Sequence, residues 1–214
     1  MNICNYQMFT VYRIIENTIM TQQLSQDYWD KRYQDDETGW DLGVPSPPIT
    51  NYVDQIKDKN IAILIPGCGN AYEAEALYEK GFQNISLIDF SPTVVKKVQA
   101  TLPESIQVHC EDFFKHQGNY DLILEQTFFC ALHPELRSQY VDKMYSLLRE
   151  NGTLAGVLFA QEFEKEGPPF GGTKAEYKTL FSKKFEILTL ETCYNSVEPR
   201  KGSELFFEFK VKDK

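Results

Sequence analysis

The segment Ile61-Ala62-Ile63-Leu64-Ile65-Pro66-Gly67-Cys68-Gly69-Asn70 decides the fold of this chain. Its first five residues form an unbroken apolar run, which is typical of a strand buried on both faces of a parallel sheet. Pro66 ends the run, and the two glycines after it permit a tight turn. Residues 71–80 then have a helical pattern that ends at Gly81, a residue favoured just after a helix. The segment therefore predicts a strand, a glycine loop and a helix in succession.

A second strand is expected over residues 85–88, and an acidic residue, Asp89, follows it directly. Asp89 lies about 20 positions after Gly67, the offset at which a carboxylate binds ribose hydroxyls in nucleotide-binding units of this kind. The strand, loop, helix, strand and acid together predict a nucleoside site with Gly67, Gly69 and Asp89 as cofactor-binding residues. An ordinary turn in an enzyme whose site lies elsewhere is the alternative.

Two details narrow the choice of nucleoside. A dinucleotide fingerprint needs a third glycine so that the backbone can approach a pyrophosphate, and this chain has Tyr72 at that position. Glu73 and Glu75 at the start of the helix would repel a phosphate. A cationic ligand without phosphate fits better, and S-adenosylmethionine is such a ligand, with a sulfonium, an ammonium and an adenosine.

Length and composition indicate one α/β domain in a reducing compartment. The chain has 214 residues and a net charge of −9, from 22 basic and 31 acidic side chains, which makes nucleic acid an unfavourable partner. No apolar run approaches the length of a membrane span. The five cysteines are scattered, which argues against a disulfide framework and against a zinc site. We expect a cytoplasmic monomer that acts on a small molecule, with no metal.

The N-terminal quarter divides into two parts. Residues 1–24 carry no clear pattern and are expected to be a poorly ordered extension, whereas residues 25–214 form a single domain. Residues 25–48, here called the aromatic segment, contain Trp29, Tyr33 and Trp40 in otherwise polar sequence and end in a proline-rich stretch that predicts an extended connector. The rings either pack this segment onto the domain or form a lid whose faces cover a cationic ligand.

Further candidate residues follow the third and fourth expected strands, 106–110 and 120–127. Asp112 and Phe113 follow the third strand, where an acid and an aromatic ring can bind an adenine, although a solvated carboxylate is the alternative. Phe128 and Phe129 follow the fourth strand and either form an apolar wall of a substrate pocket or belong to the core.

The rest of the chain completes a doubly wound sheet. Helices are expected at 49–57, 91–102, 137–149 and 173–184, and strands at 153–159, 185–192 and 204–211. The last two strands are joined with no room for a helix, which predicts an antiparallel final strand on a parallel sheet. Pro169 and Phe170, in a loop after the fifth strand, are candidates for substrate contacts.

The remaining reactive side chains form no obvious catalytic group. We favour ordinary structural roles for His109, His116 and His133, and His133 alone lies beside the expected pocket wall. Arg200 is a candidate to attract an anionic substrate, although a solvated turn residue is the favoured alternative. Cys68 is interpreted as a packing residue, since a cysteine without a partner base is a poor nucleophile.

Several segments together resemble the thiopurine methyltransferase family of S-adenosylmethionine-dependent enzymes, and most closely its thiol/halide methyltransferase branch. The matching segments extend from about residue 25 through the final strands, and the tryptophan segment with Pro66-Gly67-Cys68-Gly69 is the most specific. They are Trp29-Asp30-Lys31-Arg32-Tyr33, Gly39-Trp40-Asp41-Leu42-Gly43, Ile65-Pro66-Gly67-Cys68-Gly69, Ile88-Asp89-Phe90-Ser91, Asp112-Phe113-Phe114, Phe128-Phe129-Cys130-Ala131-Leu132 and Gly167-Pro168-Pro169-Phe170.

The resemblance implies a Rossmann-like class I methyltransferase fold, with seven mostly parallel strands, an antiparallel last strand and helices on both faces. It implies that the aromatic segment covers the cofactor, that Gly67 contacts its methionine part, that Asp89 binds the ribose, and that Asp112 and Phe113 bind the adenine. Two positions depart from the branch, which tends to have a third tryptophan at Tyr33 and a tyrosine at Gln126. The cofactor pocket, which includes Gln126, should tolerate both changes, but substrate preference need not.

The implied reaction is in-line displacement by a small soft nucleophile (a thiol, hydrosulfide, halide or thiopurine-like compound), with S-adenosylhomocysteine as the product. Such chemistry depends on positioning and a dry site, so no catalytic residue is expected beyond those that position the reactants.

Two other classes of protein stay open: a non-catalytic S-adenosylmethionine-binding relative and a nicotinamide- or flavin-dependent oxidoreductase on a Rossmann sheet. The missing third glycine counts against the oxidoreductase.

Overall fold

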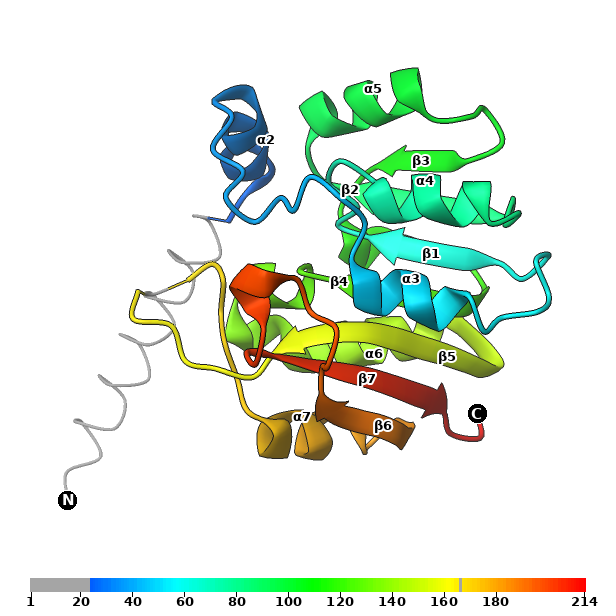
Figure 1. The fold of residues 1–214 in the computed structure, drawn as a ribbon, viewed down its shortest axis with the longest axis vertical. Coiled ribbons are helices and arrows are strands. Elements are labelled where there is room, and N and C mark those ends of the chain that lie inside the picture. The colour runs from blue at the N-terminus through cyan, green and yellow to red at the C-terminus, as the bar shows by residue number, and fades with distance from the viewer. Residues whose placement is uncertain (1–23, 166) are drawn as a thin grey trace, which may run out of the picture.

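The chain folds around a single seven-stranded sheet. The structure is a computed structural model that describes residues 24–165 and 167–214, so the expected extension lies outside it except for Leu24. The strand order is β3-β2-β1-β4-β5-β7-β6, and β7 alone runs antiparallel to its neighbours (Figure 1). The strands are β1 Ile63–Pro66, β2 Ile85–Asp89, β3 Gln107–Cys110, β4 Tyr120–Gln126, β5 Leu148–Phe159, β6 Phe185–Thr192 and β7 Glu204–Val211. The expected mostly parallel sheet with an antiparallel last strand is confirmed.

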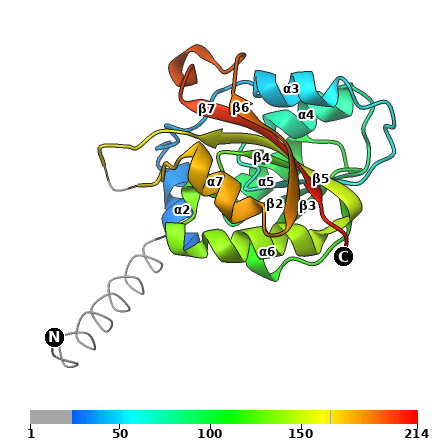
Figure 2. The same ribbon diagram turned by 90° about the horizontal axis from the view of Figure 1, so that it is seen from below.

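Helices cover both faces of the sheet, as expected (Figure 2). The α-helices are α2 Gln26–Gln34, α3 Pro47–Val53, α4 Tyr72–Glu79, α5 Pro92–Thr101, α6 Arg137–Leu147 and α7 Lys174–Phe181. Short 3₁₀ helices are η1 Phe113–Lys115, η2 Phe129–Ala131, η3 Pro134–Leu136 and η4 Glu198–Arg200. Helices α3, α4 and α5 pack on one face, and α6 and α7 pack on the other. The sheet is therefore the middle layer of three.

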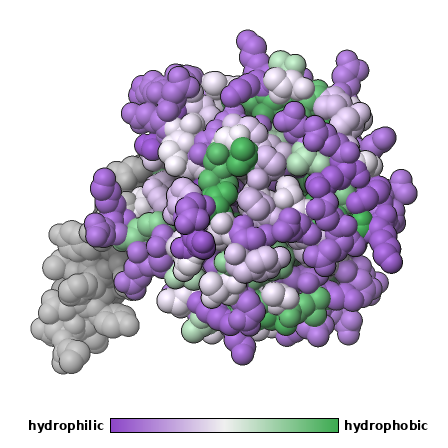
Figure 3. All heavy atoms as spheres, viewed as in Figure 1, coloured by the Kyte–Doolittle hydropathy of each residue, from purple (hydrophilic) through white to green (hydrophobic). Residues whose placement is uncertain are grey.

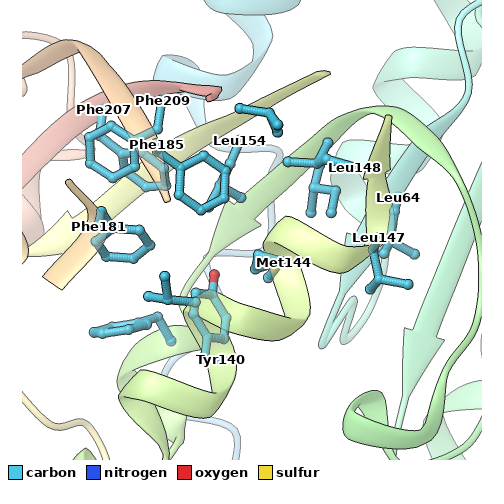
Figure 4. Packing of buried hydrophobic residues seen from close by; sticks show 14 of the residues in the cluster. Leu64, Tyr140, Met144, Leu147, Leu148, Leu154, Phe181, Phe185, Phe207 and Phe209 are labelled. Carbon is cyan, nitrogen blue, oxygen red and sulfur yellow. The ribbon is translucent and has the colours of Figure 1, made fainter. Parts of the chain in front are cut away.

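The burial of β1 explains why its sequence is apolar without alternation. Ile63 and Ile65 belong to the core cluster under α3, α4 and α5, whereas Leu64 between them belongs to the cluster under α6 and α7. Successive side chains of a strand point to opposite faces, so a strand covered on both faces needs apolar residues at every position. Figure 4 shows Leu64 beside Leu147 of α6.

The antiparallel end of the sheet is held by aromatic packing. Phe207 and Phe209 of β7 point to one face, with ring centroids 4.5 Å apart, and Phe181 of α7 lies 4.8 Å from Phe209 (Figure 4). Such rings contribute both buried area and favourable edge contacts. They fix α7 against β6 and β7.

Several boundaries differ from the expected ones. Strand β5 begins at Leu148, whereas a start at residue 153 was expected. Leu148 already pairs with Tyr120 of β4, and the register then shifts so that Leu122 pairs with Thr153. Asn151, between the two pairs, has a positive φ of 63°. The expected proline connector is wrong beyond Pro45, since Pro47 and Pro48 begin α3, where a first-turn proline needs no N–H partner. Helix α2 was not expected, and it contains no buried residue.

The surface seen in Figure 3 is mostly hydrophilic, with small separate hydrophobic groups, which agrees with the net charge of −9. Among the described residues, no helix combines the length and apolar character that crossing a membrane requires.

Candidate functional site

A cavity of about 800 Å³ is lined by residues at the ends of the parallel strands, by α2 and by the rest of the aromatic segment. The carboxyl ends of β1, β2 and β4 meet at this edge, as they do in the ligand sites of open α/β sheets. Twelve of the fourteen candidate cofactor- and substrate-binding residues line it: Trp29, Tyr33, Trp40, Gly67, Gly69, Asp89, Asp112, Phe113, Gln126, Phe128, Pro169 and Arg200. Residues spread over most of the chain therefore converge on one site.

Two candidates for the substrate pocket do not line the cavity. Phe129 is 1% exposed, and its ring packs 4.9 Å from that of Tyr140 in the core, so the prediction that it forms a pocket wall is wrong. Phe170 donates its backbone N–H to the Cys130 carbonyl at 2.7 Å, and its ring lies 5.5 Å from that of His133. The 3₁₀ turn of η2 sends adjacent phenylalanines to opposite sides, and Phe128 alone reaches the cavity.

Asp89 ends β2 and fixes the glycine loop. Its carboxylate accepts the N–H of Gly69 at 3.0 Å through Oδ2 and the N–H of Ser91 at 2.9 Å through Oδ1. The side chain is buried except at the cavity, and this burial raises its pKa, although the backbone hydrogen bonds oppose the effect. The carboxylate therefore holds the loop after β1 against the end of β2.

The two glycines of the loop are required by close neighbours. Both have positive φ, 58° at Gly67 and 51° at Gly69. A Cβ on Gly67 would lie 2.4 Å from the ring of Phe128, and one on Gly69 would lie 3.1 Å from the hydroxyl of Tyr33. A side chain at either position would therefore displace an aromatic ring that lines the cavity.

The aromatic segment forms a cluster at the cavity. Trp29 and Tyr33, from α2, place their rings edge-on to that of Trp40, with centroids 5.5 and 5.7 Å away. The guanidinium of Arg32 lies 5.5 Å from the Trp40 ring centre, at cation–π distance. These rings therefore contact one another as well as the cavity, so packing and ligand contact are not exclusive.

Polar contacts attach the aromatic segment to the sheet. The Asp30 carboxylate accepts the Ser91 hydroxyl at 2.6 Å and the Thr93 N–H at 2.8 Å, which ties α2 to the start of α5. Further along, the Asp41 carboxylate accepts a hydrogen bond from the Asn70 amide of the glycine loop. Because α2 buries no residue, these bonds set its position.

Arg200 joins the aromatic segment to β7. It is 8% exposed, so the alternative of a solvated turn residue is wrong. Its Nη2 donates to the Trp40 carbonyl at 2.7 Å, and its Nη1 lies 3.4 Å from the carboxylate of Glu204, which is itself buried. Arg200 is therefore a buried cation on the lining of the cavity.

The electrostatics of the cavity favour a cationic ligand. Its lining includes five acids, Asp41, Glu73, Asp89, Glu111 and Asp112, against two arginines. Glu73 is buried and accepts the Ser46 N–H at 2.9 Å, and burial raises its pKa. A sulfonium and an ammonium match this lining better than a phosphate.

The region after β3 contains two predicted residues and one missed group. Asp112 accepts the Phe114 N–H at 2.9 Å as the cap of η1, and Phe113 packs 5.1 Å from the Phe128 ring. The missed group is Glu111, which lines the cavity and lies 2.7 Å from Nδ1 of the buried His116. No sequence spacing indicated that pair, because a loop brings them together.

Glu125 is the other residue that sequence reasoning missed. It is 0% exposed at the end of β4, and burial raises its pKa to about 7.

Cys68 and Cys130 line the cavity, and burial raises the pKa of both thiols, so both are protonated near neutral pH. His133 also lines the cavity and accepts the Glu135 N–H at 3.4 Å through Nδ1. Among the described residues, no group of acids, cysteines and histidines is arranged to hold a metal ion.

The chain has the Rossmann-like fold of solved S-adenosylmethionine-dependent class I methyltransferases. It superposes with a TM-score of 0.74 on a 1,6-didemethyltoxoflavin-N1-methyltransferase of Burkholderia thailandensis solved with S-adenosylhomocysteine, over 91% of this chain and 90% of that one, at 15% identity. A TehB-like methyltransferase of Corynebacterium glutamicum gives a TM-score of 0.64 at 15% identity, over 87% and 98% of the two chains. Identities this low show the fold alone.

Sequence comparison gives the family. The model of the family described as thiopurine S-methyltransferase matches residues 24–211. Probable thiol methyltransferase 2 of Arabidopsis thaliana is 34% identical over 184 residues, which are 82% of this chain and 81% of the relative. Thiocyanate methyltransferase 1 of Brassica oleracea is 28% identical over 193 residues, 86% and 85% of the two chains. The chain belongs to the thiopurine methyltransferase family and uses S-adenosylmethionine, so the oxidoreductase alternative is excluded.

Proposed function

We propose that this methyltransferase transfers the methyl group of S-adenosylmethionine to a small soft nucleophile: a thiol, hydrosulfide, halide or thiopurine-like compound. The observation that carries the proposal is a single cavity that combines an acidic, nucleoside-compatible end with an apolar wall and the buried cation of Arg200. The relatives support it, because their names specify thiols and thiocyanate, both of which react through soft sulfur.

The residues of the cavity fit the cofactor. Both oxygens of Asp89 already accept a backbone N–H, but each carboxylate oxygen has a second lone pair that can accept a ribose hydroxyl. Gly67, where a Cβ would clash with the Phe128 ring, and Gly69, where a Cβ would crowd the Tyr33 hydroxyl, would lie against the methionine part. Asp112 and Phe113 would hold the adenine, and Gln126 completes this part of the pocket.

The aromatic segment would act as a lid. Trp29, Tyr33 and Trp40 line the cavity beside its acidic residues, and a ring face attracts a cation. The polar contacts of Asp30 and Asp41 hold the lid near the glycine loop, so that closure requires no unfolding. A closed lid excludes water from the reacting atoms, which strengthens every electrostatic interaction inside the site.

Bound S-adenosylmethionine supplies an electrophilic methyl carbon on its sulfonium. The protein's contribution is to orient the nucleophile in line with that carbon and to keep the site dry. Phe128 and Pro169 would form the apolar wall for the acceptor, and Arg200 would attract an acceptor that carries negative charge. A thiolate or halide already has its lone pair, so no strong base is required, and His133 is the histidine to test for a thiol acceptor.

Calorimetric titration with S-adenosylmethionine, followed in the same cell by hydrosulfide, iodide and a small thiol, tests the proposal. Binding followed by release of S-adenosylhomocysteine is the expected result, and the best acceptor defines the substrate class. Binding without turnover over a broad acceptor panel would contradict the proposed reaction and favour a non-catalytic relative. Absence of binding would contradict the cofactor assignment from Gly67 onward.

Two further expectations accompany this function. A monomer suits a site built from one chain, since every residue named above belongs to the same fold. A cytoplasmic location suits the free cysteines at positions 68, 110, 130 and 193. Sedimentation analysis and localisation of a tagged chain test these two predictions.

A further inference from the structure

We infer that Glu125 is a positioning residue for the methyl acceptor: its buried carboxylate holds the turn that places Phe128 on the apolar wall of the cavity. The inference rests on the proposed function, because this wall is where the acceptor would bind. Glu125 itself does not line the cavity and touches no proposed ligand.

The carboxylate of Glu125 is fully engaged by its surroundings. Its Oε1 accepts the backbone N–H groups of Phe128 and Phe129, both at 2.8 Å, and the Tyr140 hydroxyl donates to its Oε2. The side chain has no exposed surface. Hydrogen bonds to an ionised acceptor are stronger than those between neutral groups, so these three bonds hold the turn and Tyr140 of α6 in fixed positions around the carboxylate.

The turn held in this way is one that its sequence disfavours. Thr127 has a φ of +58°, a left-handed conformation that β-branched residues rarely adopt. Its hydroxyl donates to the side-chain oxygen of Gln126 at 2.6 Å, which fixes the direction of that amide. Strain of this kind persists only where surrounding contacts compensate for it. Two such contacts are the hydrogen bonds from the N–H groups of Phe128 and Phe129, the two residues after Thr127, to Glu125.

The turn also determines where the Phe128 ring lies. The ring is pressed against Gly67, where even a Cβ would come within 2.4 Å, and it packs edge-on against Phe113 at 5.1 Å. Phe128 therefore stands between the glycine loop and the apolar wall. A small shift of the turn would move this ring and misplace the acceptor, and misplacement by about 1 Å can cost about 100-fold in rate.

Packing alone does not explain a glutamate here. Burying a carboxylate lowers the stability of the fold relative to an apolar side chain of the same size, unless hydrogen bonds compensate for its lost hydration. The neighbouring groups give no counter-charge, since Tyr140 and Cys130 are both protonated and Glu204 on β7 is acidic. Among the contacts of Glu125, the two backbone donors of the turn are the ones that connect it to the site.

Two substitutions at Glu125 separate the effect of side-chain length from the effect of charge. Glu125→Gln keeps an oxygen that can accept both N–H groups but has no charge, whereas Glu125→Asp keeps the charge but withdraws it by one methylene. Val141→Ala, at a buried position of α6 that makes no hydrogen bond to the turn, serves as a control for lost stability. For each protein we would measure kcat with the best acceptor, the Kd of S-adenosylmethionine, and the amide NMR signals of Phe128 and Phe129.

We expect kcat to fall only in the variant that loses the hydrogen bonds between residue 125 and the turn. Glu125→Gln should keep both downfield amide signals and stay within about threefold of the wild-type kcat, whereas Glu125→Asp should lose the signals and about 100-fold in kcat with little change in cofactor affinity. Val141→Ala should keep kcat. If Glu125→Asp fails to fold, Glu125→Asp with Thr127→Gly replaces it, because glycine adopts the positive φ without strain.

Other outcomes would overturn the inference. A Glu125→Asp enzyme of wild-type activity would show that the turn does not need the carboxylate. Full loss of activity in Glu125→Gln with both amide signals unchanged would show that the charge matters and the turn does not. A wild-type protein that methylates no acceptor would instead defeat the proposed function, and the amide signals would still decide whether Glu125 anchors the turn.

Discussion

At the residue scale, two buried carboxylates have different tasks at the same edge of the sheet. Asp89 ends β2 and lines the cavity, whereas Glu125 lies near the end of β4 and faces the core. Each accepts two backbone N–H groups: Asp89 accepts one from the loop after β1 and one from the loop after β2, whereas Glu125 accepts both from the loop after β4. Asp89 therefore combines loop support with ligand contact, whereas Glu125 supports a loop alone.

Substitution Asp89→Ala should weaken binding of S-adenosylmethionine by about 1–3 kcal/mol, because charge-assisted hydrogen bonds to the ribose are lost. The Gly69 N–H would also lose its partner, which adds to the effect. Calorimetry gives the Kd of the variant and of Glu79→Ala, an exposed control at the end of α4. An unchanged Kd in a folded Asp89→Ala protein would contradict the ribose assignment.

Glu125 should make stability depend on pH. Burial raises its pKa to about 7 from 4.5, so between these values the folded state binds more protons than the unfolded state, and the free energy of unfolding falls as pH rises. Relative to Glu125→Gln, the wild type should lose about 3 kcal/mol between pH 4.5 and pH 7.5. Urea unfolding at a series of pH values measures this difference. Parallel curves for the two proteins would show that Glu125 does not titrate in this range.

At the element scale, α2 is held by polar contacts and by partly buried rings, of which Tyr33 packs against the core, and not by fully buried residues. Helix α2 has no buried residue, and Asp30 and Gln26 attach it to the loop between β2 and α5. An element held by few apolar contacts opens at low free-energy cost. This is the property expected of a lid that admits a cofactor.

Substitution Trp40→Ala should raise the Kd of S-adenosylmethionine more than that of uncharged adenosine, because only the first carries a sulfonium that a ring face attracts. The difference should be about 0.5–2 kcal/mol. Competition titrations with both ligands measure it, with Tyr78→Ala as a control for an exposed ring. Equal losses for the two ligands would assign Trp40 to packing alone.

At the scale of the whole molecule, one buried arginine joins the aromatic segment to the last strands of the sheet. Arg200, in η4, donates to the Trp40 carbonyl 160 positions away and pairs with Glu204 of β7. The site is therefore closed by a contact between the aromatic segment and the antiparallel end of the sheet.

Substitution Arg200→Met should lower the free energy of unfolding by about 3–5 kcal/mol, because Glu204 would be left buried without a partner. The double variant with Glu204→Gln should recover part of this loss. Arg149→Met is the matched control, since it breaks the exposed pair with Asp121 and should cost no more than about 1 kcal/mol. Denaturant titration compares all three. An Arg200→Met loss no larger than that of the control would show that the pair does not act as a buried one.

The strands and helices α3 to α7, in their order along the chain, the glycine loop and Asp89 follow from the amino-acid sequence alone, because each depends on residues close together in the chain. The apolar run of β1 and the helix-free link between β6 and β7 were sufficient for the mostly parallel sheet with an antiparallel strand. The family segments gave the cofactor for the same reason, since they too are local.

Only the tertiary structure decided which side chains reach the cavity. Phe128 and Phe129 are adjacent and chemically identical, and the turn anchored by Glu125 sends one to the cavity and the other to the core. Arg200 is buried because Trp40 and Glu204 surround it, and no pattern near position 200 indicates either contact. Long-range packing sets burial and hydrogen-bond partners, and sequence spacing carries no record of it.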